Sequence, residues 1–252
     1  GIESIALGFV AGFTGEAIEN GVRNMGVVTD FIHLDKGLSR INVKIKSKEE
    51  TDINAKGPDI SSKELEMLYS KIDCIQDEDT LVLAGAVPDT LPSDVYEQIM
   101  ERLKQKKINV VVDATKELLL NVLKYYPFLI KPNNYELGEM FDTVCKSETD
   151  IIKYAKELQR LGARNVLVSM AGDGAILIAE DGGIHKIGVP KGTVVNSVGA
   201  GDSMVAGFLA GYISEHNYEK ALKLGTAAGS ATAFSQGLAE RTLVEKLLKQ
   251  LG

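Results

Sequence analysis

The sequence predicts an α/β protein built around a mostly parallel sheet. From residue 81 onward, short runs that are apolar throughout alternate with longer segments in which apolar residues recur every three or four positions. Runs of the first kind are typical of strands buried on both faces, and segments of the second kind are typical of helices that cover them. A chain of 252 residues can form one large core, so we expect a single domain over residues 1–252.

The predicted elements follow in order along the chain. Apolar or alternating runs predict strands at residues 5–10, 29–34, 39–46, 81–85, 108–113, 128–131 and 165–170. Helical spacing of apolar residues predicts helices at residues 16–25, 61–75, 93–106, 117–124, 135–141, 147–161, 202–214, 218–235 and 240–251. We expect a turn at 12–15, a polar loop at 47–58, and a β-hairpin at one sheet edge from residues 175–179 and 184–189.

The strand at 39–46 alternates strictly between apolar and polar residues, which predicts that one side is buried. Its apolar side carries Ile41, Val43 and Ile45. Its other side carries Arg40, Asn42, Lys44 and Lys46. Periodicity leaves two interpretations of this basic side open, a solvated outer face or a face that meets a ligand.

Composition narrows the class of protein. The net charge is −7, and the lysines are scattered or lie near glutamates, which argues against a nucleic-acid partner. No apolar run approaches the roughly 20 residues of a membrane span, and residues 1–4 lack the features of a signal peptide. Cys74 and Cys145 have no metal-binding spacing, so we expect free thiols in a reducing cytosol and a cytoplasmic protein without a membrane partner.

The segment 194–211, VVNSVGAGDSMVAGFLAG, passes from an apolar run through a glycine turn into a helix of small residues. The turn over Gly199, Ala200 and Gly201 can direct backbone N–H groups at an anion, and the following helix adds its positive N-terminal end. A carboxylate beside a phosphate site is unfavourable unless it acts there, so Asp202 is a candidate base for a hydroxyl that attacks phosphate. The alternative is that Asp202 only caps the helix.

Polar residues also follow the predicted strands, where open α/β sheets bind ligands. Asn133 and Glu136 lie three residues apart after the strand at 128–131, and this spacing suits either a hydrated Mg²⁺ ion or a helix capping box. A glycine turn after the strand at 165–170 is a weak signal by itself. The run at 225–237 is rich in Ala, Gly and Ser, which is more typical of close helix packing than of a ligand site.

Three motifs together resemble the ribokinase-like (PfkB) carbohydrate kinases. They are Asn-Ser-Val-Gly-Ala-Gly-Asp-Ser at 196–203, Asn-x-x-Glu at 133–136 and Arg-Ile-Asn-Val-Lys at 40–44, in that family's order along the chain. The resemblance implies a ribokinase-like three-layer sandwich with a partial β lid, to which residues 29–58 contribute strands. The family usually has Asp where this chain has Asn196.

The resemblance also implies roles for individual residues. It makes Asp202 the base and Gly199, Ala200 and Gly201 the anion hole. It implies that Arg40, Asn42, Lys44 and the backbone at Gly85 contact the sugar. Many relatives have serines on either side of this glycine, where this chain has Ala84 and Ala86. It places the nucleotide against Ser169, Gly172, Gly174, Ser230 and Gly237, and Mg²⁺ at Asn133 and Glu136.

The implied activity is transfer of phosphate from ATP, with Mg²⁺, to a phosphorylated ketohexose. The strand at 40–44 is similar to the strand with which family members that act on fructose 1-phosphate or on tagatose 6-phosphate meet their sugar. The resemblance as a whole favours fructose 1-phosphate, with fructose 1,6-bisphosphate as the product, and tagatose 6-phosphate is the alternative substrate. A homodimer through the lid is one option for assembly. Family members begin with a further strand and lid segment that do not precede Gly1, so a truncated nucleotide-binding remnant without turnover is the rival expectation.

Overall fold

The computed structural model describes residues 1–46, 50–85, 87–114 and 116–252. Contacts between Cα atoms separate two compact units along the chain. The first unit comprises residues 1–77 and 86–106, and the second comprises residues 78–85 and 107–252.

The second unit is built on a mixed sheet with the strand order β12-β11-β10-β9-β8-β7. Its strands are β7 (Thr80–Ala84), β8 (Asn109–Asp113), β9 (Leu129–Ile130), β10 (Asn165–Ser169), β11 (Ala175–Ile178) and β12 (Ile184–Ile187). The four strands β7 to β10 are parallel, whereas β11 and β12 form an antiparallel hairpin at one edge. Both the parallel sheet and the edge hairpin were predicted from the sequence, and both predictions are confirmed.

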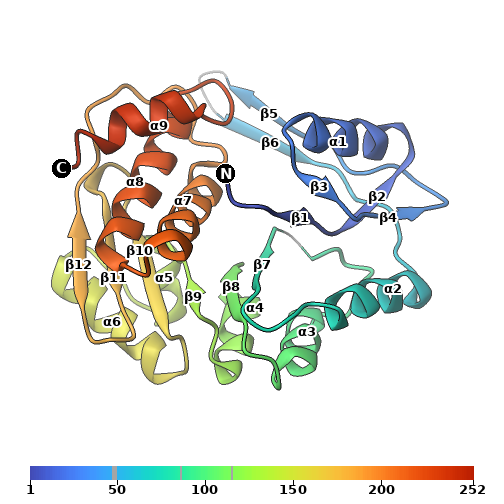
Figure 1. Ribbon diagram of the computed structural model, residues 1–252, viewed down its shortest axis with the longest axis horizontal. Helices are drawn as coiled ribbons and strands as arrows, with labels where there is room; N and C mark the ends of the chain where they lie inside the picture. The colour runs from blue at the N-terminus through green and yellow to red at the C-terminus, as the bar shows by residue number, and fades with distance from the viewer. Residues whose placement is uncertain (47–49, 86, 115) are drawn as a thin grey trace. The chain divides into compact units, whose positions relative to one another are not determined.

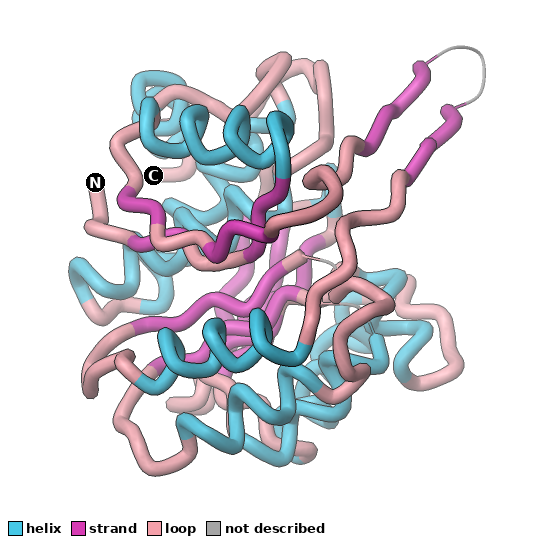
Figure 2. The backbone as a smooth tube through the Cα atoms, turned by 90° about the vertical axis from the view of Figure 1, so that its right-hand side faces the viewer, coloured by secondary structure: helices cyan, strands magenta, loops and turns pink. Residues whose placement is uncertain are grey.

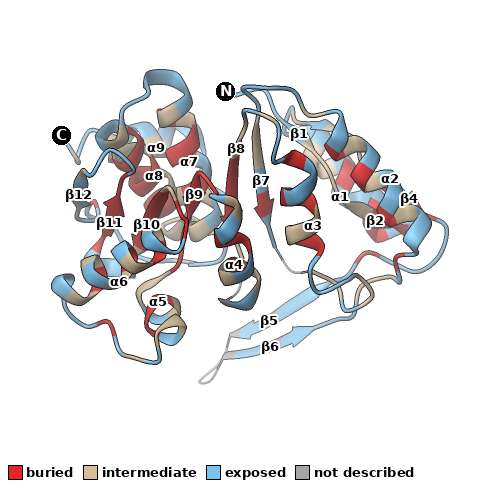
Figure 3. Cartoon of the chain, turned by 90° about the horizontal axis from the view of Figure 1, so that it is seen from below, coloured by how far each residue is buried: buried red, intermediate tan, exposed pale blue. Residues whose placement is uncertain are grey.

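Helices cover both faces of this sheet. They are α4 (Lys116–Val122), α5 (Asn134–Met140), α6 (Glu148–Arg160), α7 (Ala200–Glu215), α8 (Tyr218–Ala233) and α9 (Arg241–Leu248), with 3-10 turns at Leu123–Tyr125 and Ala171–Asp173. Figures 1 and 3 show α7 and α8 on one side of β10 and β11, and α6 on the other side. The second unit therefore has the three layers that the sequence predicts.

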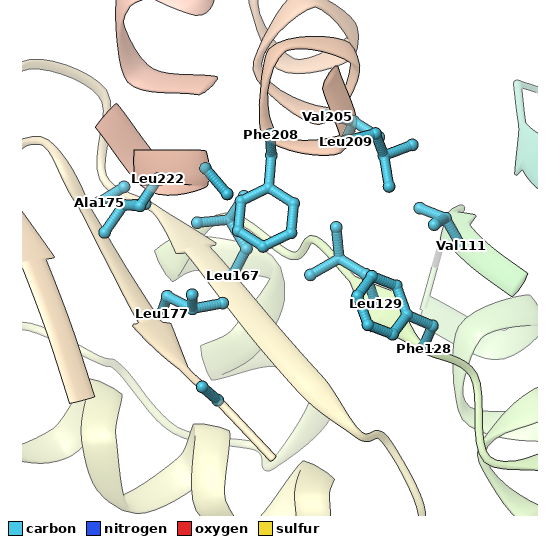
Figure 4. Close-up of a cluster of buried hydrophobic side chains, with 12 residues drawn as sticks. Val111, Phe128, Leu129, Leu167, Ala175, Leu177, Val205, Phe208, Leu209 and Leu222 are labelled. Carbon is cyan, nitrogen blue, oxygen red and sulfur yellow. The ribbon is translucent and has the colours of Figure 1, made fainter. Parts of the chain in front are cut away.

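The core of the second unit lies between the sheet and the α7–α8 pair. Phe208 of α7 is fully buried against Leu167, Leu177 and Leu129, which project from three adjacent strands (Figure 4). The two helices pack closely, because a Cβ atom at Gly207 would lie 2.7 Å from the Cβ of Ala228. This close packing explains the small residues of both helices, as the sequence suggested.

The first unit contains shorter strands and three helices in its described residues. The strands are β1 (Ile5–Ala6), β2 (Phe9–Ala11), β3 (Val28–Thr29), β4 (Ile32–Leu34), β5 (Asn42–Lys46) and β6 (Glu50–Asn54). The helices are α1 (Gly12–Asn24), α2 (Ser62–Asp73) and α3 (Val95–Leu103). Strand β1 pairs with β3 and β2 with β4 in parallel, while β5 and β6 form an antiparallel hairpin (Figure 2). A capping box between Ser61 and Glu64 forms the start of α2, where the helix at 61–75 was predicted to begin.

Four expectations for the first unit are wrong. The single strand expected at 5–10 is two strands, β1 and β2, separated at Leu7 and Gly8. The single strand expected at 29–34 is likewise two strands, β3 and β4, because β3 pairs with β1 and β4 pairs with β2. The expected turn at 12–15 is the first turn of α1, because α1 begins at Gly12 directly after β2. The expected loop at 47–58 contains β6, a strand of mainly polar residues that is specified by its pairing with β5.

The apolar side of the β5–β6 hairpin is not buried, contrary to the expectation of a half-buried strand. Ile41, just before β5, is 57% exposed, and Val43, Ile45 and Ile53 are 45%, 47% and 52% exposed. Val43 and Ile53 pair directly across the two strands, so the apolar side chains form one exposed surface.

Within the described part of the chain, the helices are too short or too polar to cross a membrane.

Candidate active site at the carboxyl edge of the sheet

The carboxyl ends of four parallel strands bring polar residues together at one edge of the second unit. Ala84 at the end of β7 pairs with Asp113 at the end of β8. Val112 pairs with Ile130, which places Lys131 opposite Asp113. An isolated bridge joins Asn133 to Ser169 at the end of β10. This edge is where a ligand is expected in an open α/β sheet.

Asp113 and Lys131 form an ion pair at the centre of this edge. The Nζ of Lys131 lies 3.3 Å from the Oδ1 of Asp113, and the side chains are 9% and 18% exposed respectively. Burial raises the pKa of Asp113 above its ordinary value, Lys131 opposes that shift, and the nearby carboxylates of Asp202 and Glu136 add to it. Three carboxylates and one ammonium group thus lie within electrostatic reach of one another.

The N-terminal turn of α7 faces this ion pair. Gly199 is the N-cap residue, with a φ of 78° that favours glycine, and Asp202 lies exposed in the first turn. No side chain among the described residues caps this helix. The alternative interpretation of Asp202 as the helix cap is therefore wrong, and its carboxylate is accessible at the edge of the sheet.

The same turn contains the backbone groups that were predicted to bind an anion. The N–H of Ala200 already donates to the carbonyl of Ser197 at 3.2 Å. The N–H groups of Gly201 and Asp202 lie in the first turn, where an α-helix provides no internal acceptor. A Cβ atom at Gly201 would lie 3.2 Å from the Nζ of Lys131, so the turn and the ammonium group are adjacent.

Asn133 and Glu136 form a complete capping box at the start of α5. The Oδ1 of Asn133 accepts hydrogen bonds from the N–H groups of Tyr135 and Glu136, both at 2.9 Å. The Oε2 of Glu136 accepts one from the N–H of Asn133 at 2.7 Å. The amide oxygen of Asn133 is thereby committed to the helix, whereas the carboxylate of Glu136 retains acceptor capacity.

The donor chemistry of this edge fits a hydrated Mg²⁺ ion better than a fully protein-bound metal. Among the described residues, no group of three or more His, Cys, Asp or Glu side chains is arranged to hold a metal ion. Mg²⁺ needs only one or two carboxylates when phosphate and water supply its other ligands. Glu136, with Asp113 and Asp202 in electrostatic reach, provides hard oxygen donors of that kind.

The residues predicted to contact the nucleotide lie in several places of the second unit. Ser169 ends β10, and the exposed Gly172 follows in a 3-10 turn. Gly174 is buried, and a Cβ atom there would lie 2.0 Å from the carbonyl oxygen of Ile187, so packing against β12 requires glycine. Ser230 is 8% exposed within α8, while Gly237 is exposed.

The residues predicted to contact the sugar are divided between the units. Gly85 follows β7 in the second unit with a φ of 88° and is exposed. Arg40 and Asn42 lie exposed on or just before β5 in the first unit. Lys44 also belongs to β5, but its side chain lies outside the described residues.

Sequence reasoning missed Asp113 and Lys131 as candidate site residues. Each is the residue at, or directly after, the end of a continuously apolar strand, which is the same signal that selected Asn133 and Ser169. The ion pair itself was not predictable, because it depends on the register between β8 and β9.

Comparisons with known proteins agree on one family. A family model described as pfkB family carbohydrate kinase matches residues 1–245. The chain is 47% identical over 250 residues to 1-phosphofructokinase from Bacillus subtilis (strain 168), covering 99% of this chain and 82% of the relative. It is 38% identical over 252 residues to D-tagatose-1-phosphate kinase from Bacillus licheniformis, covering 100% of this chain and 82% of the relative.

The fold is also found among solved structures. The chain matches the crystal structure of a Staphylococcus aureus protein provisionally named a phosphofructokinase, with a TM-score of 0.89 and 45% identity. The match covers 99% of this chain and 81% of that one. The predicted ribokinase-like α/β fold is confirmed.

The relative from Bacillus licheniformis is named as a kinase of D-tagatose 1-phosphate, and this name does not favour tagatose 6-phosphate as the alternative substrate.

Proposed function

The chain belongs to the pfkB family of carbohydrate kinases, and we propose that it phosphorylates D-fructose 1-phosphate with ATP. The oxygen of the free 6-hydroxyl attacks the γ-phosphorus of ATP, the bond from that phosphorus to the bridging oxygen breaks, and ADP leaves. The product is D-fructose 1,6-bisphosphate. The observation that carries this proposal is the exposed Asp202 in the first turn of α7, beside the Asp113–Lys131 pair.

The second unit supplies groups for each part of this transfer. Asp202 accepts the proton of the attacking hydroxyl. The N–H groups of Gly201 and Asp202, with the positive end of α7, stabilise charge on the transferring phosphoryl group. Lys131 adds a buried positive charge next to this turn, and Asp113 holds its ammonium group in place. Of the predicted anion donors, Ala200 contributes least, because its N–H is already bonded to Ser197.

Mg²⁺ bound with the ATP phosphates would neutralise their charge during the transfer. Glu136 would hold the hydrated ion through its remaining carboxylate oxygen. Asn133 acts on Glu136 rather than on the ion, because its amide oxygen and its backbone N–H both belong to the capping box.

The residues that contact the nucleotide and the sugar are proposed from the family resemblance. We propose that Ser169, Gly172, Gly174, Ser230 and Gly237 lie along ATP. The phosphate of the sugar is proposed to meet Arg40 and Lys44 of the first unit, with Asn42 and the backbone at Gly85 as further contacts, because a guanidinium group and an ammonium group together suit a phosphate dianion. We also propose that residues 1–252 act as a single kinase domain.

A coupled kinase assay with ATP and four acceptors tests this proposal. The acceptors are the 1-phosphates and the 6-phosphates of D-fructose and D-tagatose. We expect the highest kcat/KM with fructose 1-phosphate, and a C6-phosphorylated product by phosphorus NMR. Faster transfer to tagatose 1-phosphate, the C4 epimer, would assign the chain to the activity for which its second type of relative is named. ATP binding by calorimetry without transfer to any acceptor would instead identify a nucleotide-binding remnant.

We further propose that the exposed apolar side of the β5–β6 hairpin forms a homodimer. Val43, Ile45 and Ile53 present a continuous apolar surface that water would otherwise contact. Sedimentation velocity should show a dimer for the unmodified chain and a monomer for Ile53→Lys. The matched control is Ile184→Lys, at another exposed apolar residue that lies on β12 of the second unit, and it should remain dimeric.

A further inference from the structure

The first turn of α7 is held by the C-terminal end of α8 through two hydroxyl groups. The Oγ of Ser203 and the Oγ1 of Thr232 are hydrogen-bonded at 2.8 Å. Thr232 is 2% exposed, and its Oγ1 also accepts a hydrogen bond from the N–H of Ala239 at 3.3 Å. A single buried hydroxyl therefore joins the turn to α8 and to the segment that follows α8.

Two further contacts leave this turn little freedom to move. A Cβ atom at Gly229 would lie 2.9 Å from the carbonyl oxygen of Ala200, so the backbone of α8 is packed directly against the turn. The segment that leads into the turn is held at the other side, because the N–H groups of Val195 and Asn196 both donate to the carbonyl of Ala233, at 2.8 and 3.1 Å. The end of α8 thus contacts the turn before and after its glycines.

The hydroxyl of Thr232 differs from other hydroxyls near the same helix. Ser235 donates to the carbonyl of Ala231, four residues earlier, which is the usual local bond of such a side chain. Thr226 is fully buried, and its hydroxyl has no hydrogen-bond partner in the described part of the chain. Thr232 instead bonds across to α7, at the residue that follows Asp202 directly.

We propose that Thr232 is a positioning residue for phosphoryl transfer, which fixes the orientation of the first turn of α7 through Ser203. The bond to Ser203 limits rotation of this turn about the axis of α7 and so sets the direction of the Asp202 carboxylate and of the Gly201 N–H. This inference rests on the proposed kinase function, in which both groups must be aligned with the transferring phosphoryl group.

Removal of the hydroxyl at constant shape tests the proposal. Thr232→Val should lower kcat for fructose 1-phosphate about tenfold, because small misplacements of reacting groups have effects of at least that size. The KM for ATP should change by less than about twofold, because the turn is misdirected rather than lost. Thr232→Ser retains the hydroxyl and should restore most of kcat.

Two controls separate positioning from a general effect on the core. Thr226→Val removes an unpartnered hydroxyl from the same helix at equal burial, and its kcat should match that of the unmodified chain. Ser203→Ala removes the other half of the bond. The double variant Ser203→Ala with Thr232→Val should be no slower than the slower single variant, because both changes remove one interaction. An equal loss of kcat in Thr226→Val, or additive losses in the double variant, would overturn the proposal.

Amide hydrogen exchange provides a measurement that does not depend on turnover. The N–H of Ser203 donates to the carbonyl of Gly199 at 2.9 Å, so peptides over residues 197–203 report the order of the turn. Thr232→Val should speed their exchange while peptides over β8 and β9 stay unchanged. If no sugar is phosphorylated, the kinase proposal fails and this exchange still tests the bond. Unchanged exchange together with unchanged kcat would show that Thr232 only fills space.

Discussion

Gly201 leaves space for Lys131. A Cβ atom at Gly201 would lie 3.2 Å from the Nζ of Lys131, which is itself 3.3 Å from the Oδ1 of Asp113. The absence of a side chain in the first turn of α7 therefore allows a buried ammonium group to lie next to the proposed anion site.

Gly201→Ala should push the Lys131 ammonium group away from the turn. We expect kcat/KM to fall about tenfold, because a charge next to the transferring group is displaced. The free energy of unfolding should change by less than about 1 kcal/mol, because the end of a lysine can shift and alanine favours the helix. Gly188→Ala is the control, since a Cβ atom there would have no neighbour within 4 Å. A normal kcat/KM for Gly201→Ala would show that Lys131 does not act on the phosphoryl group.

Asp202→Asn keeps the shape of the side chain and removes its basicity. Turnover should fall by at least about 10²-fold, with ATP affinity by calorimetry little changed. Glu215→Gln neutralises an exposed carboxylate at the other end of α7 and should leave turnover as it is. If Asp202→Asn turns over at the normal rate, another group must accept the proton.

Glu136→Gln should weaken the binding of Mg²⁺ while helix α5 remains folded. The Mg²⁺ concentration for half-maximal rate should rise about tenfold, as is typical when a charged group around a metal is lost. The matched control is Glu64→Gln, because Glu64 is the capping-box partner of Ser61 in α2 of the first unit. A Mg²⁺ titration that is identical for both variants would mean that Glu136 serves only the helix.

Asp113 should make the stability of the protein depend on pH. Its pKa is raised, chiefly by burial, above the ordinary value of 3.8. The carboxyl group of Asp113 therefore binds a proton more tightly in the folded chain than in the unfolded chain. Its contribution to the free energy of unfolding is complete below pH 3.8 and is lost as the pH rises through the folded pKa. Urea unfolding from pH 3.8 upward should therefore show the unmodified chain losing stability relative to Asp113→Asn.

A control with the opposite sign is available in α6. The hydrogen bonds from the Ser147 side chain and backbone lower the pKa of Asp150, so its contribution is present above pH 3.8 and is lost as pH falls. Asp150→Asn should therefore reverse the trend seen with Asp113→Asn. If the free energy of unfolding changed with pH in the same direction for both variants, relative to the unmodified chain, the assignment of the raised pKa to Asp113 would be contradicted.

The parts of the fold that the sequence predicted are those with local signals. Continuous apolar runs identified β7 to β10, and Asp181, Gly182 and Gly183 marked the turn of the edge hairpin. Strand β6 was missed because its residues are mainly polar, and only the pairing with β5 makes it a strand. The exposed apolar side of that hairpin was also missed, since alternation shows which residues share a side but not whether that side is covered.

For the candidate site, the sequence predicted the short motifs but not the contacts between distant segments. The glycine turn and the Asn133–Glu136 pair are short motifs, so the sequence indicated them directly. The structure shows the capping box at Asn133, which spacing alone left as one of two interpretations. The contacts of Lys131 with Asp113 and Gly201, and the bond between Ser203 and Thr232, join segments far apart in the chain and have no local signal.

The register between β8 and β9 restricts which insertions and deletions this gene can tolerate. Val111 and Val112 pair with Leu129 and Ile130, and successive side chains of a strand point to opposite faces. One codon inserted within β9 would turn Lys131 to the other face of the sheet and separate it from Asp113. A codon inserted at the exposed hairpin turn near Gly182 would leave this register intact. Length variation among descendants of this sequence is therefore expected in turns, and not in the strands that end at the site.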